Sequence, residues 1–165
     1  MARLSIAATV VAVLAATPVI AAEATADLRG PAGENHGSVT LRAVPAGVLV
    51  HARLTGLPEG AHAFHVHAVG ACEPPFTSAG GHYNPDGALH GLAAQGGLHA
   101  GDMPNIHIPA SGALDIEVLN TALALDERLF DADGAAIVIH EGADDYTSDP
   151  AGAAGPRIAC GVIRR

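Results

Sequence analysis

Short runs in which apolar and polar residues alternate, each closed by Gly or Pro, limit most strongly how this chain can fold. Every second residue is apolar between Ser38 and Val44, and the alternation resumes from Val48 to Leu54 after a Pro-Ala-Gly turn. A period of two residues is that of a strand with one buried face, so these two runs predict a hairpin. With 20 glycines, 11 prolines and only 3% aromatic residues, the sequence favours an all-β domain with a core of Val, Ile, Leu and Ala.

Further runs suggest about eight short strands in all, with no convincing helix and no internal repeat. The additional strands are expected at residues 62–67, 106–108, 113–118, 135–140 and 158–163. Residues 123–130 fit no pattern clearly. Two long segments, 68–105 and 141–156, lack sustained periodicity. Segments of this length inside one compact domain are expected to be functional or to be held by other bonds.

A His-x-His pair stands in the expected strand at 62–67. Successive side chains of a strand point to opposite faces, so His65 and His67 share one face, and Phe64 and Val66 share the other. His62 falls on the face of Phe64 and is expected to be a core histidine held by hydrogen bonds. Elsewhere, His51 and His107 are expected to face solvent.

Five further candidate metal ligands lie downstream of this pair: His82, His90, His99, Asp102 and His140. Imidazole nitrogen suits both zinc and copper, whereas a carboxylate among histidines favours zinc. The four candidates His82, His90, His99 and Asp102 would form a His3Asp site. His65, His67 and His140 would form a face of three imidazoles. Seven ligands for two four-coordinate metals imply that one ligand is shared.

The chain has only two cysteines, Cys72 and Cys160. In an exported protein such a pair is interpreted first as a disulfide, with two buried free thiols as the alternative. Closing so long a loop would stabilise the fold by roughly 4 to 5 kcal/mol in the chain-entropy model.

The N-terminus is typical of a secretory signal peptide, because Met-Ala-Arg precedes an uncharged stretch from Leu4 to Ala22. We therefore divide the chain into a signal peptide at 1–22 and one domain at 23–165, and expect export to the periplasm or the extracellular space without stable membrane insertion. An uncleaved membrane anchor is the alternative, which Pro18 and the many alanines disfavour. The formal net charge of −9 makes nucleic acid an improbable partner.

Several motifs in a fixed order cover essentially the whole of the expected domain: residues 60–67, 78–85, 90–91, 99–102, 139–145 and 155–163. In this order they resemble the copper/zinc superoxide dismutase family. Cys72, five residues after His67 and followed by Glu73-Pro-Pro75, resembles the bacterial exported type. The resemblance implies an eight-stranded antiparallel Greek-key β-barrel with two long functional loops.

The resemblance also implies a role for each candidate residue. His65, His67 and His140 would bind copper together with His82, which would bridge to zinc. His90, His99 and Asp102 would complete the zinc site. Arg157 would be the active-site arginine, with a surface ion pair as its alternative role. Asp144 would hydrogen-bond one histidine of each site, although a solvated loop acid is the simpler interpretation of its neighbour Asp145.

The implied reaction is the dismutation of superoxide to dioxygen and hydrogen peroxide, with copper cycling between Cu(II) and Cu(I) and His82 storing a proton. All eight basic residues are arginines, so the 141–156 loop has no lysine with which to steer superoxide. The rival hypothesis is a noncatalytic metal-binding protein of the same fold, such as an exported copper carrier. A carrier would need no shared imidazole, no zinc site and no docking arginine. The sequence leaves open whether the protein forms a homodimer.

Overall fold

The computed structural model of the chain describes residues 22–165. The expected signal peptide and the alternative membrane anchor therefore lie outside the described residues, apart from Ala22. Within residues 22–165 there is no helix that is both long and apolar enough to cross a membrane. This part of the chain contains one 3-10 turn, η1 (Thr77–Ala79), and nine strands: β1 (Glu23–Arg29), β2 (Asn35–Val44), β3 (Gly47–Leu54), β4 (Gly60–His62), β5 (Phe64–His67), β6 (Ile106–Ile108), β7 (Leu114–Asn120), β8 (Ala136–His140) and β9 (Arg157–Val162).

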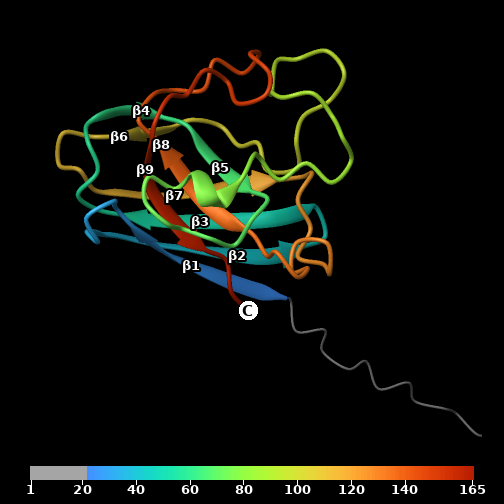
Figure 1. Cartoon of the computed structure of the whole chain (residues 1–165), viewed down its shortest axis with the longest axis horizontal. Helices are drawn as coiled ribbons and strands as arrows, with labels where there is room; N and C mark the ends of the chain where they lie inside the picture. Colours follow the sequence, from blue (N-terminus) through green and yellow to red (C-terminus); the bar gives the residue numbers. More distant parts are fainter. Residues whose placement is uncertain (1–21) are drawn as a thin grey trace, which may run out of the picture.

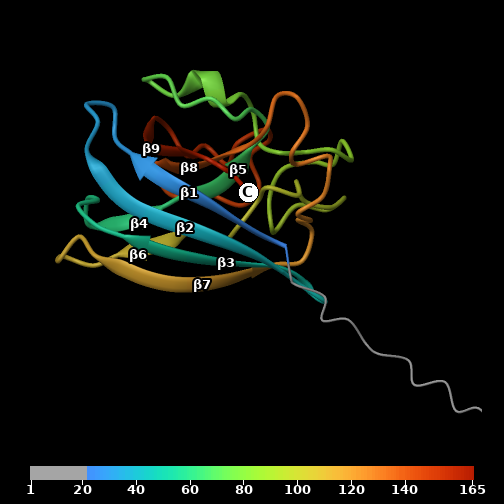
Figure 2. The same ribbon diagram turned by 90° about the horizontal axis from the view of Figure 1, so that it is seen from below.

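Seven strands form one antiparallel sheet in the order β5-β8-β9-β1-β2-β3-β7, and β4 pairs with β6 separately. The large sheet is curled, so that β5, β8 and β9 face β2, β3 and β7 across the interior (Figures 1 and 2). The space between is filled by apolar side chains from both sides, including Leu41, Val50, Phe64 and Ile137, none of which is exposed. The expected all-β class is confirmed.

The strand expected at 62–67 is divided at Ala63. The Ala63 N–H donates to the Gly142 carbonyl (2.8 Å), and the Ala63 carbonyl accepts from the His140 N–H (3.0 Å). These bonds turn the chain from one pairing to another, so β4 pairs with β6 and β5 with β8. The seven strand ranges named from the sequence become nine strands through this division and through β1, which was not predicted.

The hairpin expected at 38–54 is confirmed by β2 and β3, in which Leu41 is opposite Val50. The first strand, β1, was not predicted. Its inward residues Ala24, Ala26 and Leu28 are buried between exposed neighbours, but two alanines beside an expected cleavage site are a weak apolar signal. No strand forms at 123–130.

Strand β8, between β5 and β9, is buried on both faces and divides the core in two. Ile137 and Ile139 belong to the main core, whereas Ala136 and Val138 pack with Phe76 beneath the 68–82 segment. The Cys72–Cys160 disulfide, with a Cα–Cα distance of 5.6 Å, ties that segment to β9. This confirms the expected disulfide.

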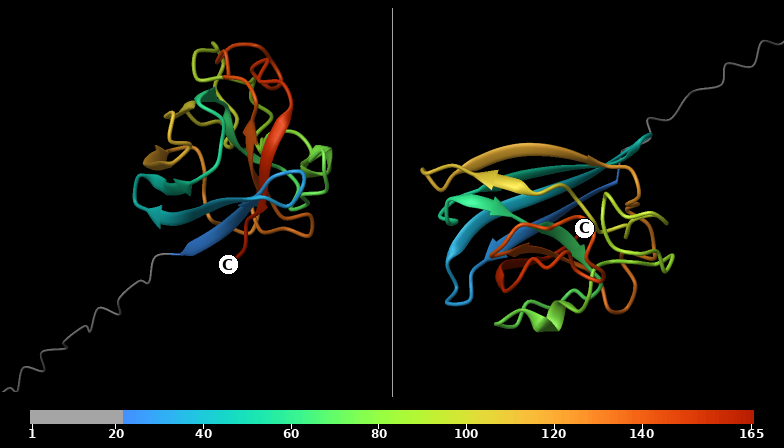
Figure 3. Two further views of the ribbon diagram at one scale, coloured as in Figure 1. Left: turned by 90° about the vertical axis from the view of Figure 1, so that its left-hand side faces the viewer. Right: turned by 90° about the horizontal axis from the view of Figure 1, so that it is seen from above.

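Residues 68–105 contain no strand, and their only regular features are η1 and an isolated bridge between His67 and His82. Residues 141–156 are equally irregular. Part of the 68–105 segment (yellow-green) lies beside the 141–156 loop at the top of the left-hand view in Figure 3. A hydrogen bond from the Ala93 N–H to the Tyr146 carbonyl (3.1 Å) joins them.

Candidate metal centre

Strands β5 and β8 bring three of the predicted histidines together. His65 and His67 are fully buried and project from β5 away from the main core, which Phe64 and Val66 enter. The register between β8 and β9 shifts after Ile139, so that His140 is opposite Arg157. Irregularities of this kind often re-aim a side chain beside a functional site.

The histidines and Asp102 form two groups of four in which every potential ligand atom lies within 4.8 Å of the others. The first group contains His65, His67, His82 and His140, and the second contains His82, His90, His99 and Asp102. All seven residues are buried. His82 belongs to both groups, and its ring centroid lies 4.0 Å from that of His65 and 5.0 Å from that of His90.

Hydrogen bonds on the outer side of the first group indicate which ring nitrogens carry protons. His65 Nε2 lies 2.8 Å from Asp144 Oδ2, His67 Nδ1 lies 3.0 Å from the Gly80 carbonyl, and His140 Nδ1 lies 3.1 Å from the Gly155 carbonyl. Because a carboxylate or carbonyl oxygen only accepts, these nitrogens donate and the opposite nitrogens keep their lone pairs. The lone-pair atoms are His65 Nδ1, His67 Nε2 and His140 Nε2, and the last two are 3.4 Å apart.

The second group converges on one oxygen. Asp102 Oδ1 lies 2.8 Å from His82 Nδ1, 3.1 Å from His90 Nδ1 and 3.4 Å from His99 Nδ1. The other oxygen, Oδ2, accepts hydrogen bonds from the backbone N–H groups of Gly91 and His99. These two bonds fix the carboxylate, so that Oδ1 faces the three imidazoles.

Local electrostatics shift the pKa values of several of these residues toward the forms that bind cations. Burial lowers the pKa of His67 to about 2, and the positive charge of Arg157 contributes. Burial also lowers the pKa of His140, to about 4. Burial alone would raise the pKa of Asp102, but hydrogen bonds from His82 and the Gly91 N–H lower it to about 2. Neutral imidazoles and an ionised carboxylate are the forms that bind metal ions.

Three buried ring nitrogens support this interpretation, because they have no hydrogen-bond partner within residues 22–165. They are His65 Nδ1, His82 Nε2 and His99 Nδ1. A buried polar atom without a partner costs roughly 1 to 3 kcal/mol, and a cation inside each group would provide the missing contact. Four imidazoles suit copper, and three imidazoles with a carboxylate suit zinc. The residues present therefore fit both metals.

Comparison with known proteins decides the family. The sequence model described as copper/zinc superoxide dismutase (SODC) matches residues 35–163. The chain belongs to the copper/zinc superoxide dismutase family.

Relatives of the chain agree with this assignment. The chain is 49% identical over 148 residues to superoxide dismutase [Cu-Zn] 2 of Aquifex aeolicus, covering 86% of each chain. Its structure is similar to that of a SOD-like protein from Bacillus subtilis (34% identity, TM-score 0.80, 84% of this chain and 96% of that one). It is also similar to the Cu/Zn superoxide dismutase of Brucella abortus (30% identity, TM-score 0.73, 87% and 100%).

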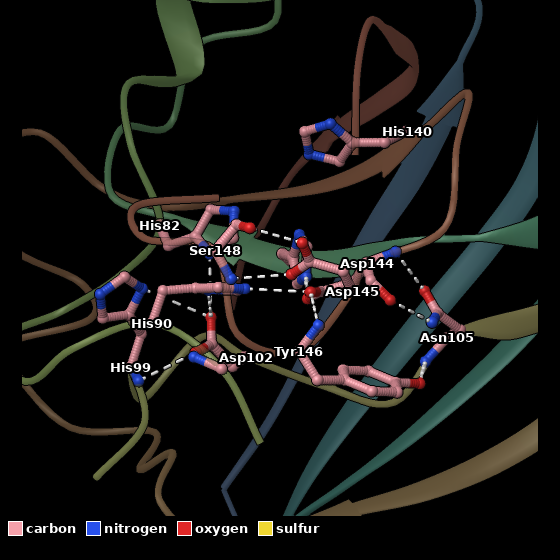
Figure 4. A network of polar contacts seen from close by, with 12 residues as sticks. His82, His90, His99, Asp102, Asn105, His140, Asp144, Asp145, Tyr146 and Ser148 are labelled. Carbon is pink, nitrogen blue, oxygen red and sulfur yellow. Dashed lines mark hydrogen bonds and ion pairs between the residues drawn. The ribbon is translucent and has the colours of Figure 1, made fainter. Parts of the chain in front are cut away.

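In this member of the family the Asp144 carboxylate connects the two donor groups (Figure 4). Its Oδ2 accepts from His65 Nε2 (2.8 Å) and its Oδ1 from His90 Nε2 (3.0 Å). Burial would raise the pKa of Asp144, but these hydrogen bonds hold it well below its usual range. The neighbouring Asp145 is exposed, and its carboxylate accepts hydrogen bonds from Thr147 and Ser148 of the same loop.

Arg157 is half-buried and makes no ion pair with the described residues. Its two terminal nitrogens donate to the carbonyls of Phe76 and Gly80, each at 2.6 Å. Both carbonyls belong to the segment that the disulfide ties to β9, so the disulfide helps to fix the guanidinium beside the first donor group. A surface ion pair, the alternative role of Arg157, does not form within this part of the chain.

The remaining histidines behave much as the sequence indicated. His62 is 3% exposed, and its ring nitrogens face the carbonyls of His140 (2.9 Å) and Pro58 (3.0 Å), so it is a hydrogen-bonded core histidine. His107 is exposed, as expected. His51 is only partly exposed, because its ring contacts Asp115 on β7.

Sequence reasoning missed Asn105. This residue directly precedes β6, and its side-chain amide bonds the main chain of Asp144. The two residues are 39 positions apart and share no local pattern. The only indication in the sequence was that Asn105 lies between Asp102, the last zinc-site candidate, and the strand expected at 106–108.

Proposed function

We propose that this protein converts superoxide to dioxygen and hydrogen peroxide: two superoxide anions and two protons give one dioxygen and one hydrogen peroxide. Family membership supports the reaction class. The observation that carries the proposal is the position of His82, which belongs to both donor groups. Its Nδ1 lies 2.8 Å from Asp102 Oδ1, and its Nε2 is buried without a hydrogen-bond partner among the described residues. A shared imidazole is what a two-metal oxidoreductase needs and a simple metal store does not.

The lone-pair assignments give each metal its ligand atoms. Copper would be held by His65 Nδ1 and by the Nε2 atoms of His67, His82 and His140. Zinc would be held by Asp102 Oδ1 and by the Nδ1 atoms of His82, His90 and His99. When bound, copper supplies the one-electron redox chemistry, and zinc supplies a fixed positive charge at His82.

The chain supplies the rest of the reaction. His82 Nε2 is buried and has no other partner within the described residues, so it is the ring atom on which a proton can be held and passed to the reduced substrate. Arg157 presents a permanent cation for the incoming anion, because only part of its guanidinium is used by the Phe76 and Gly80 carbonyls. Asp144 keeps the rings of His65 and His90 in one orientation.

The roles of a metal carrier and of a catalyst differ in what the site requires. A copper carrier of the same fold would have no use for a second donor group or for a fixed guanidinium. Here the second donor group is built from buried residues, and the half-buried guanidinium of Arg157 is fixed by a carbonyl from a distant part of the chain. Catalysis is therefore the better hypothesis.

We further propose that the protein is exported, to the periplasm or the extracellular space. The Cys72–Cys160 disulfide supports this, because such bonds persist in oxidising compartments. The N-terminal pattern at residues 1–22 adds a second argument from sequence. Whether the protein is a homodimer is a question for the measured mass in solution.

The decisive experiment is stopped-flow decay of superoxide with protein whose copper and zinc contents have been measured. We expect the decay rate to rise in proportion to copper occupancy, and protein loaded with zinc alone to be inactive. Protein that holds both metals but leaves the decay at its uncatalysed rate would refute the proposal and favour a carrier.

A further inference from the structure

We infer that Tyr146 is a positioning residue, which holds Asp144 in the orientation that links the two metal sites. The functional consequence of this inference rests on the proposed function, whereas the contacts of Tyr146 do not depend on it. Asp144 lies in an irregular loop, so no strand fixes it. Its position must come from contacts made by its own neighbourhood.

Tyr146 contacts this carboxylate directly. Its backbone N–H donates to Asp144 Oδ1 at 2.6 Å, and that oxygen also accepts from His90 Nε2. Tyr146 has a φ of 63°, a left-handed conformation that side chains other than Gly, Asn and Asp adopt rarely. In this backbone conformation the Tyr146 N–H points toward the carboxylate of Asp144, two residues earlier.

The Tyr146 hydroxyl acts on Asp144 by a second route, through Asn105. The hydroxyl oxygen accepts the Asn105 backbone N–H at 2.8 Å. The Asn105 side chain then bonds both polar groups of the Asp144 backbone, the N–H to Oδ1 at 2.8 Å and the carbonyl to Nδ2 at 2.9 Å. Figure 4 shows the phenol ring extending to Asn105, with Asp144 above.

The Tyr146 carbonyl makes a third connection, to the loop that carries the zinc-site candidates. It accepts the Ala93 N–H at 3.1 Å. The approach is so close that a Cβ at Gly91, whose φ is 111°, would meet this carbonyl oxygen at 2.0 Å. Tyr146 thus joins three segments: its own loop, the start of β6 and the loop next to His90.

Because Asp144 contacts both His65 and His90, the effect of Tyr146 should reach both donor groups. The carboxylate holds the Nε2 proton of each ring and leaves both Nδ1 atoms free for a metal. A looser Asp144 would release these protons to solvent and weaken metal binding. His67 and His140 do not contact Asp144; their Nδ1 protons go to backbone carbonyls.

The test is Tyr146→Phe, which removes the hydroxyl and keeps the ring and the backbone. Tyr83→Phe is the matched control. It removes the hydroxyl group of the only other tyrosine in the sequence, and that hydroxyl makes no hydrogen bond within residues 22–165. In zinc-loaded protein we expect the imidazole Nε2 protons of His65 and His90 to exchange with solvent several-fold faster in Tyr146→Phe. The Nδ1 proton of His67 should be unaffected.

Zinc affinity, measured by competition with a chelator, should fall about three- to tenfold in Tyr146→Phe, less than the roughly 10- to 100-fold typical when a direct partner of a ligand is lost. The hydroxyl acts through Asn105, so its effect should be much smaller in an Asn105→Ala background. Exchange rates and zinc affinity equal to those of the parent, or uniform acceleration that includes His67, would overturn the inference. Neither readout depends on catalysis, so inactive parent enzyme would refute the proposed function alone.

Discussion

Strands β2 and β3 and the segment 68–105 differ in what orders them. The two strands are adjacent in the chain, joined by a tight turn, and their buried residues face each other in register, as Leu41 does Val50. In the 68–105 segment the ordering contacts come from far away: Cys72 bonds Cys160, and Gly80 bonds Arg157. Local periodicity specifies the first region, whereas contacts with residues far along the chain, including a disulfide and hydrogen bonds, specify the second.

The difference predicts how each region should respond to damage. Apolar burial stabilises the sheet whether or not a metal is bound. The loops converge on two groups of mutually close imidazoles, one of which includes the Asp102 carboxylate, and a cation bound within each group would add to their order. Loss of metal, of the disulfide or of a ligand should therefore affect the loops first.

The largest effect is expected for His82→Ala, because this residue supplies a ligand atom to both groups. Zinc affinity should fall by more than about 100-fold, since even the loss of a residue that only supports a ligand costs roughly 10- to 100-fold. The copper spectrum should change in the same variant, and superoxide dismutation should be lost. Chelator competition and visible spectroscopy are the measurements.

His51→Ala is the matched control, because His51 lies on β3, its ring bonds Asp115 on β7, and it belongs to neither donor group. It should keep both metals and full activity. Zinc binding by His82→Ala at the parent's affinity would refute the shared-ligand assignment.

Replacing both cysteines, as Cys72→Ser with Cys160→Ser, should lower the melting temperature by roughly 5 to 15 °C, from about 2 to 5 kcal/mol of lost stability. The damage should be local at temperatures below melting. Amide hydrogen exchange should accelerate in residues 68–82, while the amides of β2 and β3 keep their protection. Faster exchange in β2 to the same degree would show that the two regions are not ordered separately.

Leu41→Ala tests the opposite region. Leu41 is fully buried in the sheet core, so the change should cost about 2 to 5 kcal/mol of unfolding free energy through lost burial and a cavity. Zinc affinity of the folded protein should stay within about twofold of the parent. Chemical denaturation and zinc titration measure the two quantities, and a proportionate loss of zinc affinity would contradict the comparison.

Arg157→Ala should have the smallest effect, about a tenfold loss of the superoxide reaction rate, because one cation near the site accounts for most of the attraction. The loop from 141 to 156 has no lysine. Most acidic residues are expected to lie beyond the screening length of about 8 Å at physiological salt. The parent rate should therefore fall only shallowly with added salt.

Arg53→Ala, which removes an exposed arginine paired with Asp115 on the sheet, is the control and should leave the rate unchanged. A steep salt dependence that persists in Arg157→Ala would mean that other cations steer the anion.

The same difference between regions explains how much the sequence could predict. Alternation revealed β2, β3 and β7, and strand geometry placed His65 beside His67, because these relations are local. The metal-ligand candidates were found by residue type and by resemblance to a family. The roles of Asn105 and Tyr146 left no such trace, since Asn105 contacts Asp144 across 39 positions. Likewise, the division at Ala63 depends on bonds to residues near 140.

The most direct test of the shared His82 is the electron paramagnetic resonance spectrum of copper in protein that carries cobalt(II) in place of zinc. Cobalt(II) accepts the same nitrogen and oxygen ligands and is paramagnetic, so an imidazole bound to both ions would couple their spins. We expect a strong copper signal when zinc is present and a suppressed one when cobalt fills the zinc site. A copper signal of full intensity beside fully occupied cobalt would show that His82 does not join the two metals.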